Sequence, residues 1–184
     1  MGGGWGDDGN LDAWAAGARA QEAAAARTRQ RWLRQQAAEQ ADFASLLVEW
    51  RERGSPVAVT TAVGRCYHQA RITAVGRDCV ALATAQGRVL LSSRAVVAVQ
   101  PHDETEVTLA IDMRSTSDDS MDELVQRAAH DRELVTIHVD GAPEPFVGEL
   151  QACGRDVVVI RLERTGAVVY LTLASVSEMS FDSG

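Results

Sequence analysis

The sequence predicts a mostly β protein with helices: two tandem small five-stranded barrels, each preceded by a helix, the first of them long. Three observations lead to this fold class. The stretch 74–82, AVGRDCVAL, returns 78 positions later as 152–160, ACGRDVVVI. Apolar residues alternate with a period of two through both copies, which is typical of short, half-buried strands. Residues 11–54 contain no proline and are rich in Ala, Gln, Glu and Arg, which favours a helix.

We expect residues 1–10 to be a flexible N-terminus and residues 11–54 to form one long helix. Asn10 suits the N-cap position, and Gly54 before Ser-Pro is a typical helix stop. Three tryptophans recur every 18 residues, which is five helical turns, so they would share one side of a straight helix. This side should pack on a barrel or on a partner helix. The residues predicted for that contact are Trp14, Trp32, Phe43, Leu47 and Trp50.

The first barrel is expected over residues 55–112. Turn residues divide this segment into five short apolar runs. The alternation of Val107, Leu109 and Ile111 with polar or small residues predicts one further strand. Residues 113–119 are acidic and serine-rich, which is typical of a linker. The strands of the barrel are predicted at 57–63, 66–75, 79–83, 89–91 and 95–99.

The second unit is expected over residues 120–184, as a helix followed by a second barrel. Ser120 and Glu123 form a capping-box pattern that opens a helix running to about His130. The offset of 78 aligns the two units, and one added residue near Gly166 brings the last strands into line. The predicted equivalences include Val57 with Val135, Val59 with Ile137, Ile72 with Leu150, Leu82 with Ile160, Ala95 with Ala174 and Val97 with Val176.

Composition limits the function classes. The net charge is −8, yet residues 55–101 carry five arginines and one acid, so only the first barrel is basic. All 18 basic residues are arginine, which fits the actinobacterial-like vocabulary of a high-GC genome. No apolar run reaches the roughly 20 residues of a membrane span, and the N-terminus has no secretion leader, so we expect a cytoplasmic protein without membrane contact. Cys66, Cys79 and Cys153 are expected to be buried free thiols.

No catalytic residue, metal site or cofactor is predicted. The four histidines are too dispersed in the sequence to suggest a metal site. No Ser-His-Asp order, phosphate-binding glycine loop or carboxylate pair stands out. In the repeated Gly-Arg-Asp stretch, 76–78 and 154–156, we expect a tight turn in which Gly supplies an unusual dihedral angle and Asp caps backbone N–H groups. The arginine of this turn is expected to pair with an acid or to contact phosphate.

A helix, five bent strands with Gly-Arg-Asp before the third, and a closing strand that ends at Gln100-Pro101 resemble the Sm-like (LSm/Hfq-like) family. Residues 57–101 and 134–179 match this pattern in the same order, together about half of the chain. The resemblance implies RNA binding and association through the fourth and fifth strands. A tandem could then pair its own barrels, or three chains could form a ring of six.

Two departures from that family bear on function. The basic Lys-His pair expected before the last strand is replaced by 92–94, Ser-Ser-Arg, and by 171–173, Leu-Thr-Leu. The aromatic stacking residue before the third strand is absent in both copies. The resemblance and the basic charge therefore limit the predicted nucleic-acid contact to the first barrel. Its candidate residues are Arg94, Arg77, Arg65, Arg71 and Arg88.

Two functions remain open at this point. One is a regulatory module that binds single-stranded RNA or another nucleic acid through the first barrel. The other is a protein-interaction scaffold that has lost RNA binding and uses its N-terminal helix to contact a protein partner. Either function is compatible with a homo-oligomer.

Overall fold

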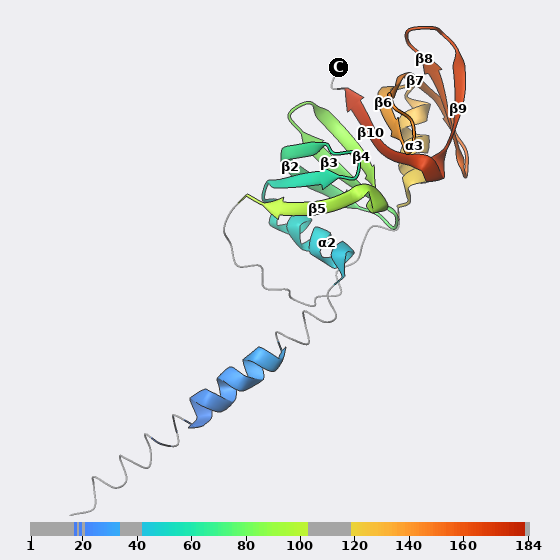
Figure 1. Cartoon of the computed structure of the whole chain (residues 1–184). Helices are drawn as coiled ribbons and strands as arrows, with labels where there is room; N and C mark the ends of the chain where they lie inside the picture. Colours follow the sequence, from blue (N-terminus) through green and yellow to red (C-terminus); the bar gives the residue numbers. More distant parts are fainter. Residues whose placement is uncertain (1–16, 18, 20, 34–41, 103–118, 183–184) are drawn as a thin grey trace, which may run out of the picture. The chain divides into compact units, whose positions relative to one another are not determined.

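The structure is a computed structural model that describes residues 17, 19, 21–33, 42–102 and 119–182. The described residues fall into two compact units. In the first unit, residues 17, 19 and 21–33 are helical and exposed to solvent. The second unit begins at Asp42 and contains all of the described strands (Figure 1). The predicted strand at 107–111 and most of the predicted linker lie outside the described residues.

The second unit consists of two halves with the same succession of elements. The first half comprises α2 (Phe43–Arg53), β1 (Val57–Thr61), β2 (Cys66–Val75), β3 (Cys79–Thr84), β4 (Gly87–Ser92), the 3-10 helix η1 (Ser93–Ala95) and β5 (Val96–Pro101). The second half comprises α3 (Met121–His130), β6 (Leu134–Val139), β7 (Phe146–Cys153), β8 (Val157–Leu162), β9 (Val168–Thr172), η2 (Leu173–Ser175) and β10 (Val176–Asp182).

The ten strands form one open antiparallel sheet, so the prediction of two separate five-stranded barrels is wrong. The strand order is β5-β1-β2-β3-β4-β10-β6-β7-β8-β9. The two halves join where β4 pairs with β10, from Gly87 opposite Asp182 to Leu91 opposite Glu178. The physical reason is that β4 would otherwise expose a row of unpaired backbone groups. The second half supplies β10 to that edge from the same chain.

The predicted single helix over 11–54 is also wrong, because a new helix starts at residue 43. Asp42 has an extended backbone, with φ −103° and ψ 162°, and its carboxylate accepts a hydrogen bond from the Ser45 N–H. This hydrogen bond lowers the pKa of Asp42. An N-cap aspartate favours such a break because its side chain satisfies a backbone donor that a continuing helix would bond itself. The predicted stop is confirmed, since Gly54 has φ 62°.

The register of the strands corrects the alignment of the two halves. Ala98 lies opposite Thr60 in the first half, and Glu178 lies opposite His138 in the second. Because Thr60 and His138 are 78 residues apart while Ala98 and Glu178 are 80 apart, the offset grows by two residues, not by one. The extra residues lie in the turn between β8 and β9, which is longer than the turn between β3 and β4.

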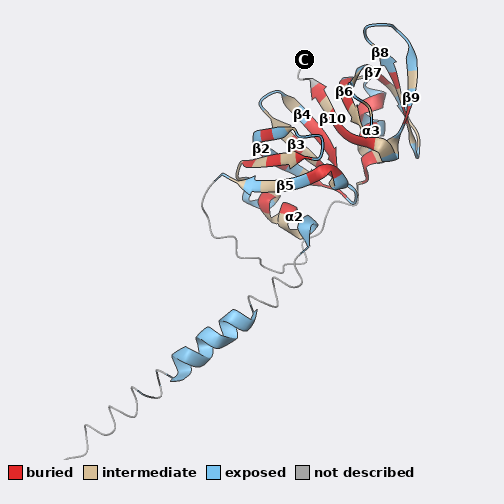
Figure 2. Cartoon of the chain, in the orientation of Figure 1, coloured by how far each residue is buried: buried red, intermediate tan, exposed pale blue. Residues whose placement is uncertain are grey.

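Each half has an apolar core beneath its helix. In the first half, Leu47 and Trp50 of α2 are buried against the sheet. In the second half, α3 buries one face against β7, and the capping box at Ser120 is confirmed. The second core also takes in Cys79 and Leu90 of the first half. Most residues of β4 and β10 are buried, so the interior continues across the boundary between the halves (Figure 2).

Candidate functional site: the junction and the open edges

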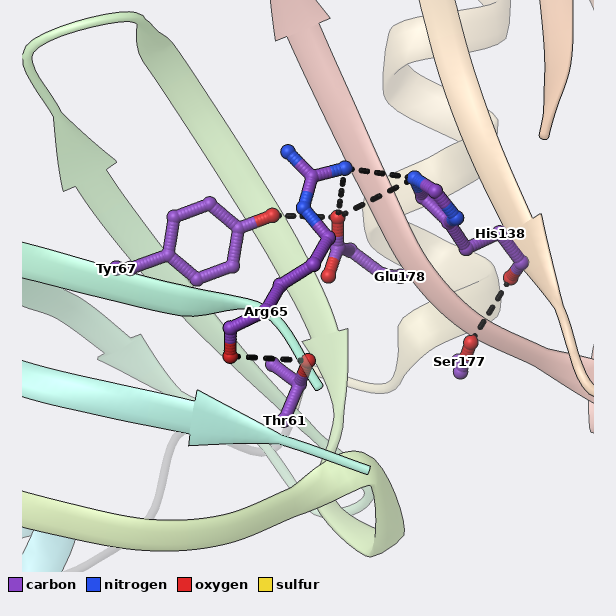
Figure 3. Close-up of polar contacts among 6 residues, drawn as sticks. All are labelled: Thr61, Arg65, Tyr67, His138, Ser177 and Glu178. Atoms are coloured by element: carbon purple, nitrogen blue, oxygen red, sulfur yellow. Dashed lines mark hydrogen bonds and ion pairs between the residues drawn. The ribbon is translucent and has the colours of Figure 1, made fainter. Parts of the chain in front are cut away.

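A polar cluster fastens the two halves together beside the β4–β10 pair. Tyr67 and Arg65 come from the start of β2 and the turn before it, whereas His138 and Glu178 lie on β6 and β10 (Figure 3). The Tyr67 hydroxyl donates a hydrogen bond to Glu178 Oε1. Arg65 Nη1 lies 3.0 Å from the same oxygen. One carboxylate oxygen therefore holds two side chains of the other half.

The carboxylate at the centre of this cluster is buried, so its charge needs compensation from neighbouring groups. Glu178 has no exposed side-chain surface, and its Oε2 has no hydrogen-bond partner among the described residues. A buried carboxylate is tolerated only where a cation and hydrogen-bond donors compensate it. Arg65 supplies the cation and also lies over the Tyr67 ring, 5.4 Å from the ring centre. The first half thus supplies both the cation and the hydroxyl that compensate the buried Glu178.

His138 completes the cluster as a neutral acceptor. Arg65 Nη1 approaches His138 Nε2 at 2.6 Å, so the guanidinium donates and the imidazole nitrogen accepts. Burial lowers the pKa of His138, and Arg65 lowers it further, against the opposing effect of Glu178. The pKa of Tyr67 is raised, first by burial and then by its hydrogen bond to Glu178. Both side chains are therefore held in their neutral forms.

The first copy of the repeated Gly-Arg-Asp turn provides a second contact between the halves. Asp78 Oδ1 accepts the backbone N–H of Met121 at 2.8 Å, and the Arg77 N–H donates to Asp119 O at 3.0 Å. Asp78 therefore accepts a backbone N–H, as predicted for the Asp of this turn, but its donor is the first residue of α3 and does not belong to the turn itself. The first copy of the turn thus positions the helix of the second half.

The glycine of this turn is needed for space, not for an unusual dihedral angle as predicted. Neither Gly76 nor Gly154 has a positive φ. A Cβ on Gly76 would lie 2.5 Å from Asp119 O and 2.7 Å from Cys79 Sγ, whereas the nearest atom to a Cβ on Gly154 would be 3.2 Å away. The turn at 76–78 is crowded because the chain entering α3 lies against it.

Three of the five arginines predicted to bind nucleic acid are paired with acids of the second half. Arg65 pairs with Glu178, Arg88 Nη2 lies 2.5 Å from Glu133 Oε2, and Arg94 Nη2 lies 3.0 Å from Asp140 Oδ2. Arg94 also donates to the backbone carbonyl of Val176.

The other two arginines have different surroundings. Arg71 donates to the backbone carbonyl of Gly54, at the end of α2. Arg77 lies in the exposed turn that contacts Asp119. Nucleic-acid binding by the five arginines stays a prediction, while the structure gives most of them intrachain contacts.

The residues predicted to meet a partner helix divide into two groups. Leu47 and Trp50 belong to the core of the first half, so they pack within their own chain. Trp32 and Phe43 are exposed, at 61 % and 42 %. Trp14 lies outside the described residues. A partner for the N-terminal helix stays a prediction that rests on Trp32 and its neighbours.

Of the three cysteines, two fit the expectation of shielded thiols and one does not. All three thiols are free; Cys79 is buried and Cys153 is partly buried, whereas Cys66 is exposed. Burial raises the pKa of Cys79 to about 12 and that of Cys153 to about 11. The prediction for Cys66 is wrong because the burial of β2 alternates, and residue 66 falls on its exposed face.

Among the described strands, the outermost two, β5 and β9, each pair on one side only. They carry exposed apolar side chains, namely Val97 at 63 %, Val168 at 43 % and Tyr170 at 72 %. Tyr170 in the second half corresponds to Leu90 in the first. Leu90 lies opposite Ala81 of β3, and Tyr170 lies opposite the equivalent residue of β8, Val159. Leu90 is only 4 % exposed because it lies at the junction.

A groove of about 550 Å³ lies at the end of the second half, between the β6–β7 and β8–β9 turns. Its apolar lining includes Pro143, Pro145, Phe146, Val147 and Leu162, and its charged residues are Glu144 and Arg164. A second cavity, of about 290 Å³, lies between α3 and the β3–β4 hairpin, beside the Arg88–Glu133 ion pair.

Within the described part of the chain, no helix is long and apolar enough to cross a membrane. The same residues include no group of three or more His, Cys, Asp or Glu side chains that could hold a metal ion.

The sequence alone does not predict the polar cluster. As one of the four dispersed histidines, His138 suggests no metal site, and no sequence-based prediction involves Tyr67 or Glu178. The alignment of Glu178 with Ala98 would have been informative, because it replaces a small apolar residue with a buried acid. The assumed single-residue shift concealed this difference by placing Glu178 on Val99.

Comparison with protein-family models, with curated proteins and with solved structures finds no match. Nothing in these comparisons identifies an Sm-like family, and the continuous sheet differs from the separate barrels that the resemblance implied. The RNA-binding function implied by that resemblance consequently finds no support.

Proposed function

We propose that this protein is a non-enzymatic assembly module of the cytoplasm, whose copies associate head to tail when β5 of one copy adds to β9 of the next. The observation that carries the proposal is the β4–β10 pair. In this pair, the fifth strand of the second half, β10, adds to the fourth strand of the first half, β4, within one chain. The same two kinds of edge, at β9 and β5, have no partner strand in the described part of the chain.

The register of the junction specifies the register of the association. Leu91 lies opposite Glu178 and Leu90 opposite Met179 in the chain. By the equivalence of the halves, Leu171 would lie opposite Ala98 of a second copy, and Tyr170 opposite Val99. Backbone hydrogen bonds would then saturate both edges, and the exposed Tyr170 would gain the cover that its counterpart Leu90 has.

The charge distribution favours this proposal over nucleic-acid binding. Arg65, Arg88 and Arg94 have acidic partners within the chain, so phosphate would have to compete with those partners. An open β edge, in contrast, has backbone donors and acceptors without a strand partner and favours another strand.

The test is the mass of the full chain in solution, measured by light scattering during size-exclusion chromatography at several concentrations. The wild type should exceed the 19.8 kDa of one chain, increasingly so with concentration. Val168→Lys with Tyr170→Lys should return it to one chain, because lysines on an edge strand oppose pairing. Leu134→Lys is the matched control, since Leu134 is 53 % exposed but lies on β6, inside the sheet.

A cysteine pair checks the register. In a Cys66→Ser background, Tyr170→Cys combined with Val99→Cys should give disulfide-linked multimers under mild oxidation. A wild type of one-chain mass at all concentrations, or a control that dissociates as fully as the β9 variant, would overturn the proposal.

A further inference from the structure

The junction inside the chain and the proposed junction between chains differ in chemistry. Tyr67 lies opposite Val59, and its counterpart Phe146 lies opposite Ile137. The counterpart of Glu178 is Ala98, and that of His138 is Thr60. At the proposed junction, Phe146 therefore has no hydroxyl where Tyr67 has one. Ala98 and Thr60 likewise replace the carboxylate of Glu178 and the imidazole of His138.

These replacements make two of the four conceivable strand additions unfavourable. If β10 of another copy added to β9, the buried Glu178 would lie near Phe146 and Glu144, without the Tyr67 hydroxyl and without Arg65. If β5 of another copy added to β4, Ala98 would face Tyr67 and Arg65 and leave both without their acceptor. Burying the Glu178 carboxylate without its partners is strongly unfavourable, and leaving the buried Tyr67 hydroxyl without an acceptor also costs free energy.

The other two additions match chemically. The pair β4–β10 brings the Tyr67 hydroxyl and the Arg65 guanidinium to Glu178 Oε1. The pair β9–β5 would bring Ala98 toward the apolar groove at Phe146, where a small side chain needs no polar partner. Arg164 at this groove is exposed, so it can remain in water in the assembled state.

We infer that the cluster of Arg65, Tyr67, His138 and Glu178 is a pairing-selectivity element, which reserves β4 for β10 of the same chain and leaves β9 for β5 of a second copy. The inference rests on the proposed function. It identifies the second copy's β5 as the partner and fixes the order of halves as first, second, first, second along an assembly.

The central test places the junction's acid on the edge that should lack it. Ala98→Glu introduces a carboxylate at the position that corresponds to Glu178, so it should weaken self-association at least about tenfold, the equivalent of about 1.4 kcal/mol. Ala98 is exposed in the single chain, so the fold should be retained, as circular dichroism and thermal unfolding can check. Ala98→Gln is the matched neutral control and should weaken association less.

A second change tests the chemistry itself. Phe146→Tyr should recover part of the association lost in Ala98→Glu, because it supplies the hydroxyl that Tyr67 supplies at the junction. The same change in the wild type should bring no gain, since Ala98 offers no acceptor. Concentration-dependent light scattering of all five proteins provides the readout.

The outcomes separate the two proposals. A wild type that never exceeds one-chain mass overturns the proposed function, and this inference falls with it. A wild type that associates, together with an Ala98→Glu variant that associates equally well, overturns the inference alone. Equal weakening by Ala98→Gln and Ala98→Glu would also overturn it, because the charge would then have no role.

Discussion

Tyr67 and Glu178 are 111 residues apart in the sequence and share a buried hydrogen bond across the two halves of the sheet. Arg65 binds the same carboxylate oxygen, so a guanidinium from one half balances the charge of an acid of the other, to which the aromatic hydroxyl donates. The donors therefore lie in one half and their acceptor in the other, so the stability of each half depends on its contact with the other. The predictions below test this dependence and the local contacts around it.

Removing Arg65 should destabilise the protein more than neutralising Glu178. Arg65→Met leaves a fully buried carboxylate without its cation, at a cost of about 2–4 kcal/mol, somewhat below the value for a fully buried pair because Arg65 reaches water. Glu178→Gln leaves a guanidinium that can turn to solvent, so a loss of about 1–2 kcal/mol is expected. Urea unfolding measures both values.

Arg161→Met is the control for this comparison, because Arg161 is an exposed arginine on β8. It should change the free energy of unfolding by less than about 0.5 kcal/mol. An Arg65→Met variant as stable as Arg161→Met would show that the ion pair contributes nothing to the junction.

Stability should fall as the pH is lowered from 7 toward 5, in part because of His138. The folded protein lowers the pKa of this imidazole below its usual 6.5, so the unfolded chain binds the proton first. Where the unfolded state holds more protons, the free energy of unfolding decreases with falling pH. The loss should begin near pH 6.5 and level off below the folded pKa.

His138→Gln tests this assignment, since its amide oxygen can still accept from Arg65 but does not titrate. Comparing urea midpoints of wild type and variant at several pH values isolates the histidine from the other acids. Parallel profiles for the two proteins would refute the assignment.

Gly76→Ala should be harmful and Gly154→Ala mild, although the two glycines occupy the same place in the repeat. The new methyl group at residue 76 meets the Asp119 carbonyl and the Cys79 sulfur, and the carbonyl belongs to backbone that must move. Such overpacking typically costs about 1–3 kcal/mol. At residue 154 the nearest atom is a methyl group of Val157, which can shift slightly.

Thermal unfolding of the two alanine variants measures this difference. Equal melting temperatures would mean that the segment entering α3 does not lie against the first turn. Asp78→Ala offers an independent check, because it removes the acceptor for the Met121 N–H and should cost about 0.5–2 kcal/mol.

Local patterns in the sequence predicted much of the unit's construction. The alternation of apolar residues predicted five strands in each half, and Gly54 and the box at Ser120 marked a helix end and a helix start correctly. These features depend on interactions between residues close in the chain, so a short stretch of sequence is enough to predict them.

The joining of the halves could not be predicted in this way. The β4–β10 pair is a backbone contact between strands about 90 residues apart, and backbone edges carry no side-chain pattern. The burial of Glu178 could not be predicted either, because a single acid in a strand usually faces water. Only a correct register of the last strands, with Glu178 on Ala98, would have marked it as unusual.

The three cysteines should differ sharply in reactivity toward a thiol reagent such as DTNB near pH 8. Cys66 is exposed on β2 and should react fast in the native protein. Cys79 and Cys153 should react only at the rate of local or global opening, because burial shields them and raises the pKa values to about 12 and about 11, so little thiolate forms.

One thiol should therefore react rapidly with DTNB in buffer, and all three should react rapidly in denaturant. The Cys66→Ser variant should lose the fast phase while keeping the slow ones. Since Cys79 belongs to the core shared by the two halves, Arg65→Met should accelerate its reaction more than that of Cys153 if the polar cluster holds the junction closed. Equal acceleration of both thiols would indicate that the chain opens as a whole, and that the junction does not separate before the halves unfold.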